Sequence, residues 1–211
     1  AKINPGKITK ILITHWHGDH ILGIPGLLQT LALSGYKKTL QIYGPSGTKK
    51  FMGELLQVFH FANEIKIEVK ELDKEGIFFE DKNFFLESKK MSHGCPCNAY
   101  VFVEKGKLRI DKKKLLKSKL PLGPLLQKIK EGKDVIHDGK KYKAKDLTYM
   151  QGEKKISFVL DTGFNDKIVP LVKSSDLVVI ESTYADDMKE TAKDYKHLTS
   201  SQSAEIAKKP R

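Results

Sequence analysis

Apolar and polar positions in the N-terminal part of the chain alternate between patterns typical of strands and patterns typical of helices. The apolar runs at 8–14 and 40–43 each predict a buried strand. The spacing at 27–33 predicts a helix, and Ser46 is in a position to cap a second helix that continues through Phe59. The pattern therefore predicts strands and helices in alternation.

The pattern changes after residue 65, where short apolar runs follow one another without helical spacing. Apolar residues alternate with polar ones at 65–69, and further short runs lie at 77–79, 84–86 and 100–103. These runs predict a meander of antiparallel strands.

Two later apolar runs each end in an acidic residue. The run at 156–160 leads into Asp161, and the run at 177–180 leads into Glu181. Polar residues at the ends of buried strands are typical of functional sites. The last stretch, 200–209, has the pattern of a beginning helix.

Length and composition favour a soluble globular protein. The 211 residues suffice for one sizeable domain, so we expect a single domain over 1–211. No apolar run is long enough to cross a membrane, and residues 1–10 lack the apolar core of a secretory signal. Cys95 and Cys97 are too few and too close together for a disulfide framework, so we expect a cytoplasmic location.

Positive charge is concentrated in one segment. The formal net charge is +12, and residues 104–146 carry fifteen Lys and Arg against six Asp and Glu. This clustering favours a nucleic-acid partner over a general compositional bias. The segment is broken by glycines and prolines, and we interpret it as an insertion with few large apolar residues. A solvated, mobile loop without function is the alternative.

A cluster of metal-binding side chains follows the first predicted strand. Gly23, Pro25 and Gly26 come soon after it as breakers, so we expect the cluster on a loop at the strand end. Imidazole and carboxylate groups are typical zinc ligands, and four of them within six residues indicate a metal site more than a histidine-rich polar turn. The four residues are His15, His17, Asp19 and His20.

This cluster resembles the HxHxDH signature of the metallo-β-lactamase superfamily, and more of the chain resembles its ribonuclease Z branch. The matching features are the 23–28 turn, the 42–45 strand end, His93 followed by Tyr100, Asp161 in Leu-Asp-Thr-Gly, Glu181-Ser-Thr and His197-Leu-Thr. The resemblance implies an α/β fold, the four-layer αβ/βα sandwich. The chain lacks the family's upstream strands and final histidine ligand, so we expect a sandwich truncated at both ends.

The resemblance also implies a binuclear zinc centre, with manganese or magnesium as alternatives. It implies that His15, His17 and His93 hold the first metal and that Asp19 and His20 help to hold the second. Asp161 would bridge the two ions. By position alone, His93 could equally be an ordinary polar residue and Asp161 a helix cap.

Glu181 and His197 match a pair that separates ribonuclease Z from small-molecule hydrolases, although Ser182 stands where alanine is commoner in the family. A carboxylate beside an imidazole orients it and stabilises its protonated form, as a proton donor requires. Asp19 would accept the proton of the attacking water. The implied activity is tRNA 3′ processing endoribonuclease, leaving a 3′-hydroxyl on the tRNA.

The basic insertion resembles the arm with which ribonuclease Z binds precursor tRNA, and the resemblance also implies a homodimer. Two alternatives stay open: a lactonase or thioesterase on the same scaffold, and a non-catalytic RNA-binding relative. The residues expected to bind nucleic acid are Lys112, Lys113, Lys114, Lys117, Lys119, Pro121, Gly123, Pro124, Lys128 and Lys130.

Overall fold

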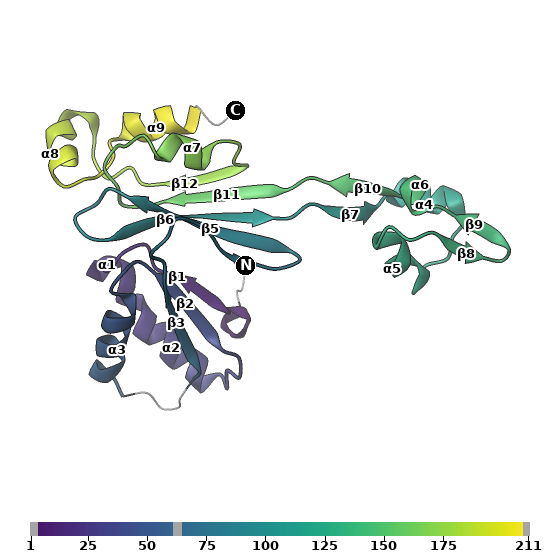
Figure 1. Ribbon diagram of the computed structural model, residues 1–211, viewed down its shortest axis with the longest axis horizontal. Helices are drawn as coiled ribbons and strands as arrows, with labels where there is room; N and C mark the ends of the chain where they lie inside the picture. Colours follow the sequence, from purple (N-terminus) through teal and green to yellow (C-terminus); the bar gives the residue numbers. More distant parts are fainter. Residues whose placement is uncertain (1–3, 61–64, 209–211) are drawn as a thin grey trace. The chain divides into compact units, whose positions relative to one another are not determined.

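The computed structural model describes residues 4–60 and 65–208 and divides the chain into two compact units (Figure 1). The first unit comprises the described parts of Ala1–Glu80, Phe85–Phe102 and Lys155–Arg211. The second unit comprises Asp81–Phe84 and Val103–Lys154. The second unit extends beyond the expected 104–146 insertion, since it includes the strand at 148–151, which pairs with the strand at 107–110.

A parallel three-stranded sheet forms one layer of the first unit. Its strands are β1 (Lys10–Leu12), β2 (Leu40–Gly44) and β3 (Ile67–Glu71), in that order. The first strand is thus shorter than the apolar run at 8–14. We expected β3 to begin the antiparallel meander, but it pairs in parallel with β2. A helix between the two strands supplies the long crossover connection that parallel pairing requires.

Helices cover this sheet and differ in detail from the prediction. They are η1 (Pro5–Lys7), α1 (Gly18–Ile21), α2 (Gly23–Leu33) and α3 (Thr48–Val58). The expected breakers Gly23, Pro25 and Gly26 lie inside α2, where proline in the first turn removes no helical hydrogen bond.

The start of α3 also differs from the expectation. Its N-cap is Gly47, with a φ of +94°, and not Ser46. The Ser46 hydroxyl instead donates a hydrogen bond to Asp73. Leu28 and Leu31 of α2 pack against Leu40 and Ile42 of β2 in a fully buried core.

A five-stranded sheet forms the second layer, in the order β12-β11-β6-β5-β4. Tyr43 of β2, Tyr100 of β6 and Phe78 of β4 pack together between the two sheets. Helices lie on the outer side of each sheet (Figure 1), so the predicted αβ/βα sandwich is confirmed. The strands are β4 (Gly76–Glu80), β5 (Phe84–Met91), β6 (Cys97–Glu104), β11 (Lys154–Val159) and β12 (Leu177–Ile180).

The remaining helices of the first unit follow β11 and β12 in sequence. They are α7 (Ile168–Val172), η2 (Asp186–Met188), α8 (Lys189–Asp194) and α9 (Ser200–Lys208). Helix α9 agrees with the helix expected at 200–209, whose last residue lies outside the described residues. In the described part of the chain, no helix is long and apolar enough to cross a membrane.

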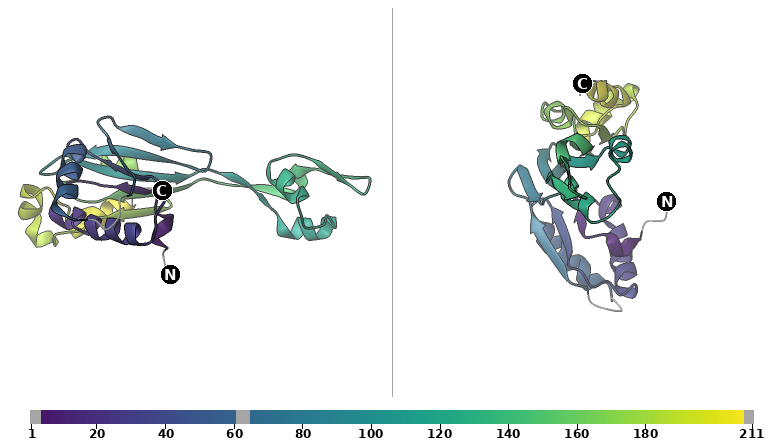
Figure 2. Two further views of the ribbon diagram at one scale, coloured as in Figure 1. Left: turned by 90° about the horizontal axis from the view of Figure 1, so that it is seen from below. Right: turned by 90° about the vertical axis from the view of Figure 1, so that its right-hand side faces the viewer.

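The second unit, whose short helices and strands are also seen in the two views of Figure 2, has its own hydrophobic core, so the expectation of few large apolar residues was wrong. Leu115, Leu120, Ile129, Val135 and Leu147 are all buried in it. A segment with such a core is a folded unit and not a solvated loop. Its elements are β7 (Lys107–Ile110), α4 (Lys112–Ser118), α5 (Leu125–Lys130), β8 (Val135–His137), β9 (Lys140–Tyr142), α6 (Ala144–Leu147) and β10 (Thr148–Gln151).

Candidate functional site

The histidine-rich segment leaves the end of β1 and is held in place by the neighbouring strands. Ile13 N donates to the carbonyl of Tyr43, and the Tyr100 hydroxyl donates to the Ile13 carbonyl at 2.6 Å. Asn98 N donates to the carbonyl of Thr14. These bonds from β2 and β6 fix the backbone just before His15, which is 0% exposed. His20 lies on α1, so the cluster is part loop and part helix.

Three histidines each have one ring nitrogen held by a partner outside the cluster. His93 Nδ1 lies 3.1 Å from the carbonyl oxygen of Lys196, which can only accept, so this nitrogen carries the proton. His15 Nδ1 lies 3.1 Å from Thr14 Oγ1, and His17 Nε2 lies 3.7 Å from Cys95 Sγ. Such outer contacts orient metal-binding imidazoles and set their tautomers.

The other nitrogens of the same rings face one another. His93 Nε2 and His17 Nδ1 are 3.2 Å apart. His15 Nε2 is buried and has no hydrogen-bond partner among the described residues. A buried nitrogen without a partner costs about 1–3 kcal/mol unless something binds it. The arrangement therefore fits a ligand at the point where the three nitrogens converge.

Carboxylates also belong to the cluster, and Asp161 lies close to several of its histidines. Asp161 Oδ2 lies 3.7 Å from His15 Nε2 and 3.2 Å from His20 Nε2. One group with metal-ligand geometry consists of His15, His17, His93 and Asp161, and another of Asp19, His20 and Asp161. In each group, the ligand atoms lie within 4.8 Å of one another. These donors are the ones that divalent metals of the zinc type prefer.

Burial keeps the central imidazoles neutral, which is the form that binds a metal. It lowers the pKa of His15 from 6.5 to about 4, with a further contribution from His20 nearby. Burial also lowers the pKa of His93, against the opposing effect of its hydrogen bond to Lys196. The donor set, its protonation and the unpartnered His15 nitrogen all fit a divalent metal.

These shifts predict that acid destabilises the metal-free protein. Between pH 6.5 and about 4, the unfolded chain protonates His15 while the folded chain does not. The free energy of unfolding should therefore fall as the pH drops through this window, by about 3 kcal/mol for His15 alone. Urea unfolding with a chelator present, at pH 7 and pH 4, measures the effect. His60→Gln, which changes an exposed histidine, should retain this dependence. His15→Gln should weaken it, and an unaltered dependence would contradict the account.

Glu181 and His197 lie together beside the cluster. Glu181 Oε2 is 3.1 Å from His197 Nδ1, and Asp161, Glu181 and His197 form a third close group. Glu181 is 9% exposed, and its carboxylate also accepts bonds from Thr162 N, Leu198 N and the Thr183 hydroxyl. The carboxylate thus orients His197 through Nδ1 and leaves Nε2 to face other groups.

Several residues of the site were missed by sequence reasoning. Lys196, in the left-handed region at φ +55°, accepts from His93 Nδ1 and donates through Nζ to the His93 carbonyl. Gly163 approaches it so closely that an added Cβ would lie 3.3 Å from the Lys196 Cα. Cys95 and Thr14 hold the other two rings. No local sequence pattern predicts these contacts. Lys196 and Cys95 are distant in sequence from the histidines that they contact, and Thr14 is a residue type that is common throughout proteins.

Comparison with known proteins identifies the family of the chain. Residues 1–90 match the model of the metallo-beta-lactamase superfamily. The chain is 38% identical to ribonuclease Z of Bacillus cereus (strain B4264) over 98% of this chain and 68% of that protein. The chain belongs to the ribonuclease Z family.

Solved structures of similar proteins share the fold of this chain. The human tRNase Z, short form, is 25% identical with a TM-score of 0.68, covering 99% of this chain and 70% of that chain. A long form RNase Z from yeast shares the fold at 14% identity and a TM-score of 0.59, over 96% of this chain and 27% of its own. The family predicted from the sequence is confirmed.

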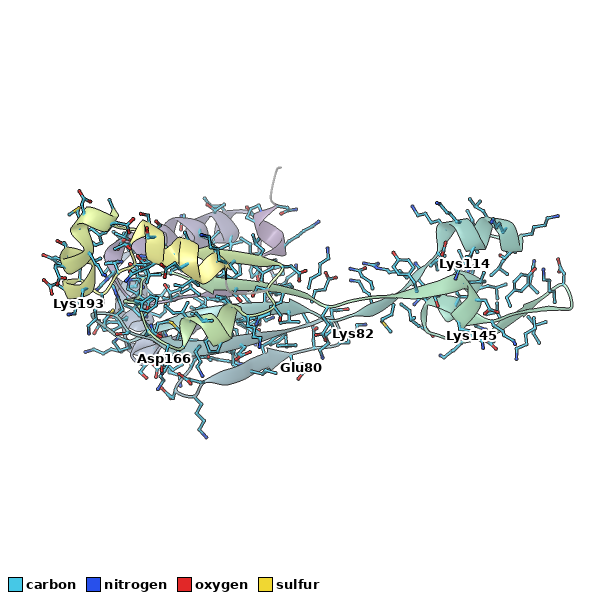
Figure 3. All side chains as sticks on the ribbon, turned by 90° about the horizontal axis from the view of Figure 1, so that it is seen from above. Glu80, Lys82, Lys114, Lys145, Asp166 and Lys193 are labelled. Atoms are coloured by element: carbon cyan, nitrogen blue, oxygen red, sulfur yellow. The ribbon has the colours of Figure 1, made fainter. Side chains whose placement is uncertain are left out.

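The residues expected to bind nucleic acid all lie in the second unit and are exposed. Lys112, Lys113, Lys114 and Lys117 lie on α4, and Lys119 ends that helix at φ +61°. Pro121 and Gly123 lie in the connection to α5, Pro124 is the N-cap of α5, and Lys128 and Lys130 lie on that helix. Figure 3 labels Lys114 on α4 and Lys145 on α6.

The same unit contains an open groove of about 510 Å³. Arg109, Lys112 and Lys130 line it together with apolar side chains and Tyr149, which is 54% exposed. Cationic groups beside an exposed aromatic ring are typical of surfaces that bind nucleic acid. The sequence pattern did not single out Arg109 or Tyr149, because β7 and β10 bring them together only in the folded unit.

Proposed function

We propose that this chain is a ribonuclease Z that removes the 3′ trailer from precursor tRNA and leaves a 3′-hydroxyl. The observation that carries the proposal is the pair of buried Glu181 and half-buried His197 beside the His and Asp cluster, in a chain of this family. A hydrolase of small molecules on the same scaffold would have no use for a protonated imidazole here or for a basic second unit. A cytoplasmic location goes with this substrate.

The proposed cofactor is a pair of zinc ions, with manganese or magnesium as alternatives. His15, His17 and His93 would hold one ion, Asp19 and His20 would help to hold the other, and Asp161 would serve both. A divalent metal in such a site lowers the pKa of water towards neutrality and stabilises negative charge developing on a phosphate.

Protein side chains would carry out the proton transfers. The exposed Asp19 carboxylate, which lies 3.3 Å from His20 Nε2, would accept a proton from the attacking water. His197, oriented by Glu181, would donate a proton to the departing 3′ oxygen of the tRNA. Cleavage of this bond leaves a 3′-hydroxyl tRNA and a trailer with a 5′-phosphate.

The second unit would bind the body of the tRNA through its exposed lysines. We also propose a homodimer, in which the second unit of one subunit serves the metal centre of the other. Family resemblance supports this arrangement, and light scattering of the full-length protein with and without precursor tRNA tests it.

Neutralising Lys112, Lys113, Lys114 and Lys117 to Gln should weaken tRNA binding without unfolding the second unit, because Leu115 and the rest of its core are retained. The logarithm of the tRNA binding constant falls linearly with the logarithm of the salt concentration. Each lost phosphate contact should make this slope less steep by about 0.7 to 0.9. The measurement is precursor tRNA cleavage at several salt concentrations, beside hydrolysis of bis(p-nitrophenyl) phosphate.

We expect the quadruple variant to lose tRNA cleavage and keep hydrolysis of the small diester. A matched quadruple change at exposed lysines of the first unit, Lys37, Lys49, Lys50 and Lys74, should affect tRNA cleavage less. Equal effects of the two sets would mean that binding depends on total charge and not on α4.

A substrate panel separates the proposed function from its rivals. The full-length protein should cleave precursor tRNA and hydrolyse phosphodiesters in preference to lactones and thioesters. Preference for a lactone or thioester would favour the small-molecule hydrolase. A full-length protein that binds RNA without cleaving it, and holds fewer than two metal ions per chain, would favour the non-catalytic relative.

A further inference from the structure

A cavity of about 490 Å³ lies in the first unit directly beside His197. A volume of this size is typical of pockets that hold a small molecule or one nucleotide. The wall is formed by the loop that follows Asp161, by α8, and by the segment around His197. Its lining residues are Ser92, Gly163, Phe164, Lys189, Glu190, Lys193, Lys196, His197 and Gln202.

We propose that this cavity binds the last nucleotide of the mature tRNA, the one whose 3′ oxygen is released. The inference rests on the proposed function, since it takes His197 as the proton donor. In a cleavage that leaves a 3′-hydroxyl, the departing oxygen belongs to the nucleotide on the 5′ side of the broken bond. A proton donor must lie within hydrogen-bond reach of that oxygen. The nucleotide must therefore lie next to His197, and this cavity is a space that His197 lines.

The orientation of His197 supports this placement. Glu181 engages Nδ1 through both carboxylate oxygens, at 3.1 and 3.2 Å. Nε2 is thus the nitrogen left to donate to the substrate, and the His197 ring lines the cavity.

The charge of the cavity suits a nucleotide with its phosphate. Three lysines and one glutamate line it, so cations exceed anions. Lys196 Nζ already donates to the carbonyl of His93. Lys189 and Lys193, both exposed on α8, remain to contact a phosphate on the 5′ side of the nucleotide (Figure 3 labels Lys193).

Phe164 supplies a flat apolar surface in the same wall. Its side chain is 53% exposed although it lies in a loop that hydrogen bonds hold on both sides. Gly163 N donates to the carbonyl of Ser92 at 2.8 Å, and Asn165 Nδ2 donates to the carbonyl of Gly163 at 2.8 Å. An exposed aromatic ring on a fixed backbone is a stacking platform for a base, and every base has a face that can stack. The subsite should accept any of the four bases, as an enzyme acting on many tRNAs requires.

The test is a double-mutant cycle between Phe164 and the base that it would stack on. Cleavage efficiency (kcat/KM) is measured for full-length wild type and Phe164→Ala, on precursor tRNA and on the same RNA with an abasic last nucleotide. Loss of one base stack corresponds to about a 5- to 150-fold decrease. Phe164→Ala should show such a decrease on the normal substrate and almost none on the abasic one. Phe164→Trp should retain activity, and Phe164→Leu should not.

Two controls locate the effect. Phe59→Ala removes a similarly exposed phenylalanine, 43% exposed at the end of α3, and should not couple to the abasic site. A third substrate is abasic at the first trailer nucleotide and should behave like the normal one with both proteins.

Each further outcome contradicts the proposal at a defined point. If Phe164→Ala instead lost its effect on the substrate that is abasic at the first trailer nucleotide, the cavity would bind that trailer nucleotide and not the last nucleotide of the tRNA. Independent losses on all three substrates would mean that Phe164 supports the loop and does not touch a base. Failure of the wild type to cleave any precursor tRNA, while it hydrolyses a small diester, would overturn the proposed function itself.

Discussion

Replacing Asp161 by alanine is expected to abolish cleavage and to remove metal from the protein. Its carboxylate belongs to every close group of potential ligands found in the described residues, whereas His93 belongs to one. It lies within 3.7 Å of His15 and 3.2 Å of His20, so it also balances the charge of ions held there. Asp161→Ala should therefore lower bound metal more than His93→Ala does. Metal content per chain and turnover of precursor tRNA measure both effects.

Asp166→Ala is the matched control for this prediction. Asp166 lies in the same connection and is exposed, and it belongs to none of the three groups. It should keep full metal content and full activity. The shared role of Asp161 would be contradicted by an Asp161→Ala protein that retains two metal ions and normal turnover.

His197→Ala should slow cleavage by roughly 100- to 10,000-fold, the range typical of general acid catalysis. Metal content should not change, because the groups that combine His15, His17, Asp19, His20 and His93 do not include His197. Single-turnover cleavage of precursor tRNA, with metal analysis of the same preparation, tests this separation. A loss of metal that parallels the loss of rate would make His197 a ligand and not a proton donor.

Glu181→Gln should act in the same direction, and the double variant should be little worse than His197→Ala alone. The two residues act as one unit, since the carboxylate holds the imidazole. Glu181→Gln should also destabilise the fold, because the buried carboxylate accepts bonds from Thr162 N and Leu198 N. If the rate loss of the double variant equalled the product of the two single losses, the residues would have separate tasks.

Local patterns were sufficient to predict the metal-ligand cluster and most strands. The HxHxDH spacing brings four coordinating groups together within one short segment, so distance along the chain gives their proximity directly. The acidic ends of β11 and β12 were visible for the same reason, because parallel strands end at one edge of a sheet.

Contacts between distant segments could not be predicted in this way. Lys196 holds His93 from 103 positions away, and Gly163 is favoured by the close approach of Lys196 rather than by a local turn. The direction of β3 depends on the crossover through α3, and alternation of apolar residues gives no strand direction. The core of the second unit was overlooked because its lysines dominate the composition, although Leu115 and Ile129 lie on the inward sides of two lysine-rich helices.

The most direct measurement is the chemistry of the ends that the full-length protein produces from precursor tRNA. The substrate carries a labelled 3′ trailer, and an unstructured RNA of the same length serves as control. The account predicts one principal cut at the 3′ end of the tRNA body, a 3′-hydroxyl on the tRNA and a 5′-phosphate on the trailer, with loss of cleavage when a chelator is added. Equal cleavage of the unstructured RNA, a 2′,3′-cyclic phosphate on the tRNA product, or full activity in chelator would contradict it.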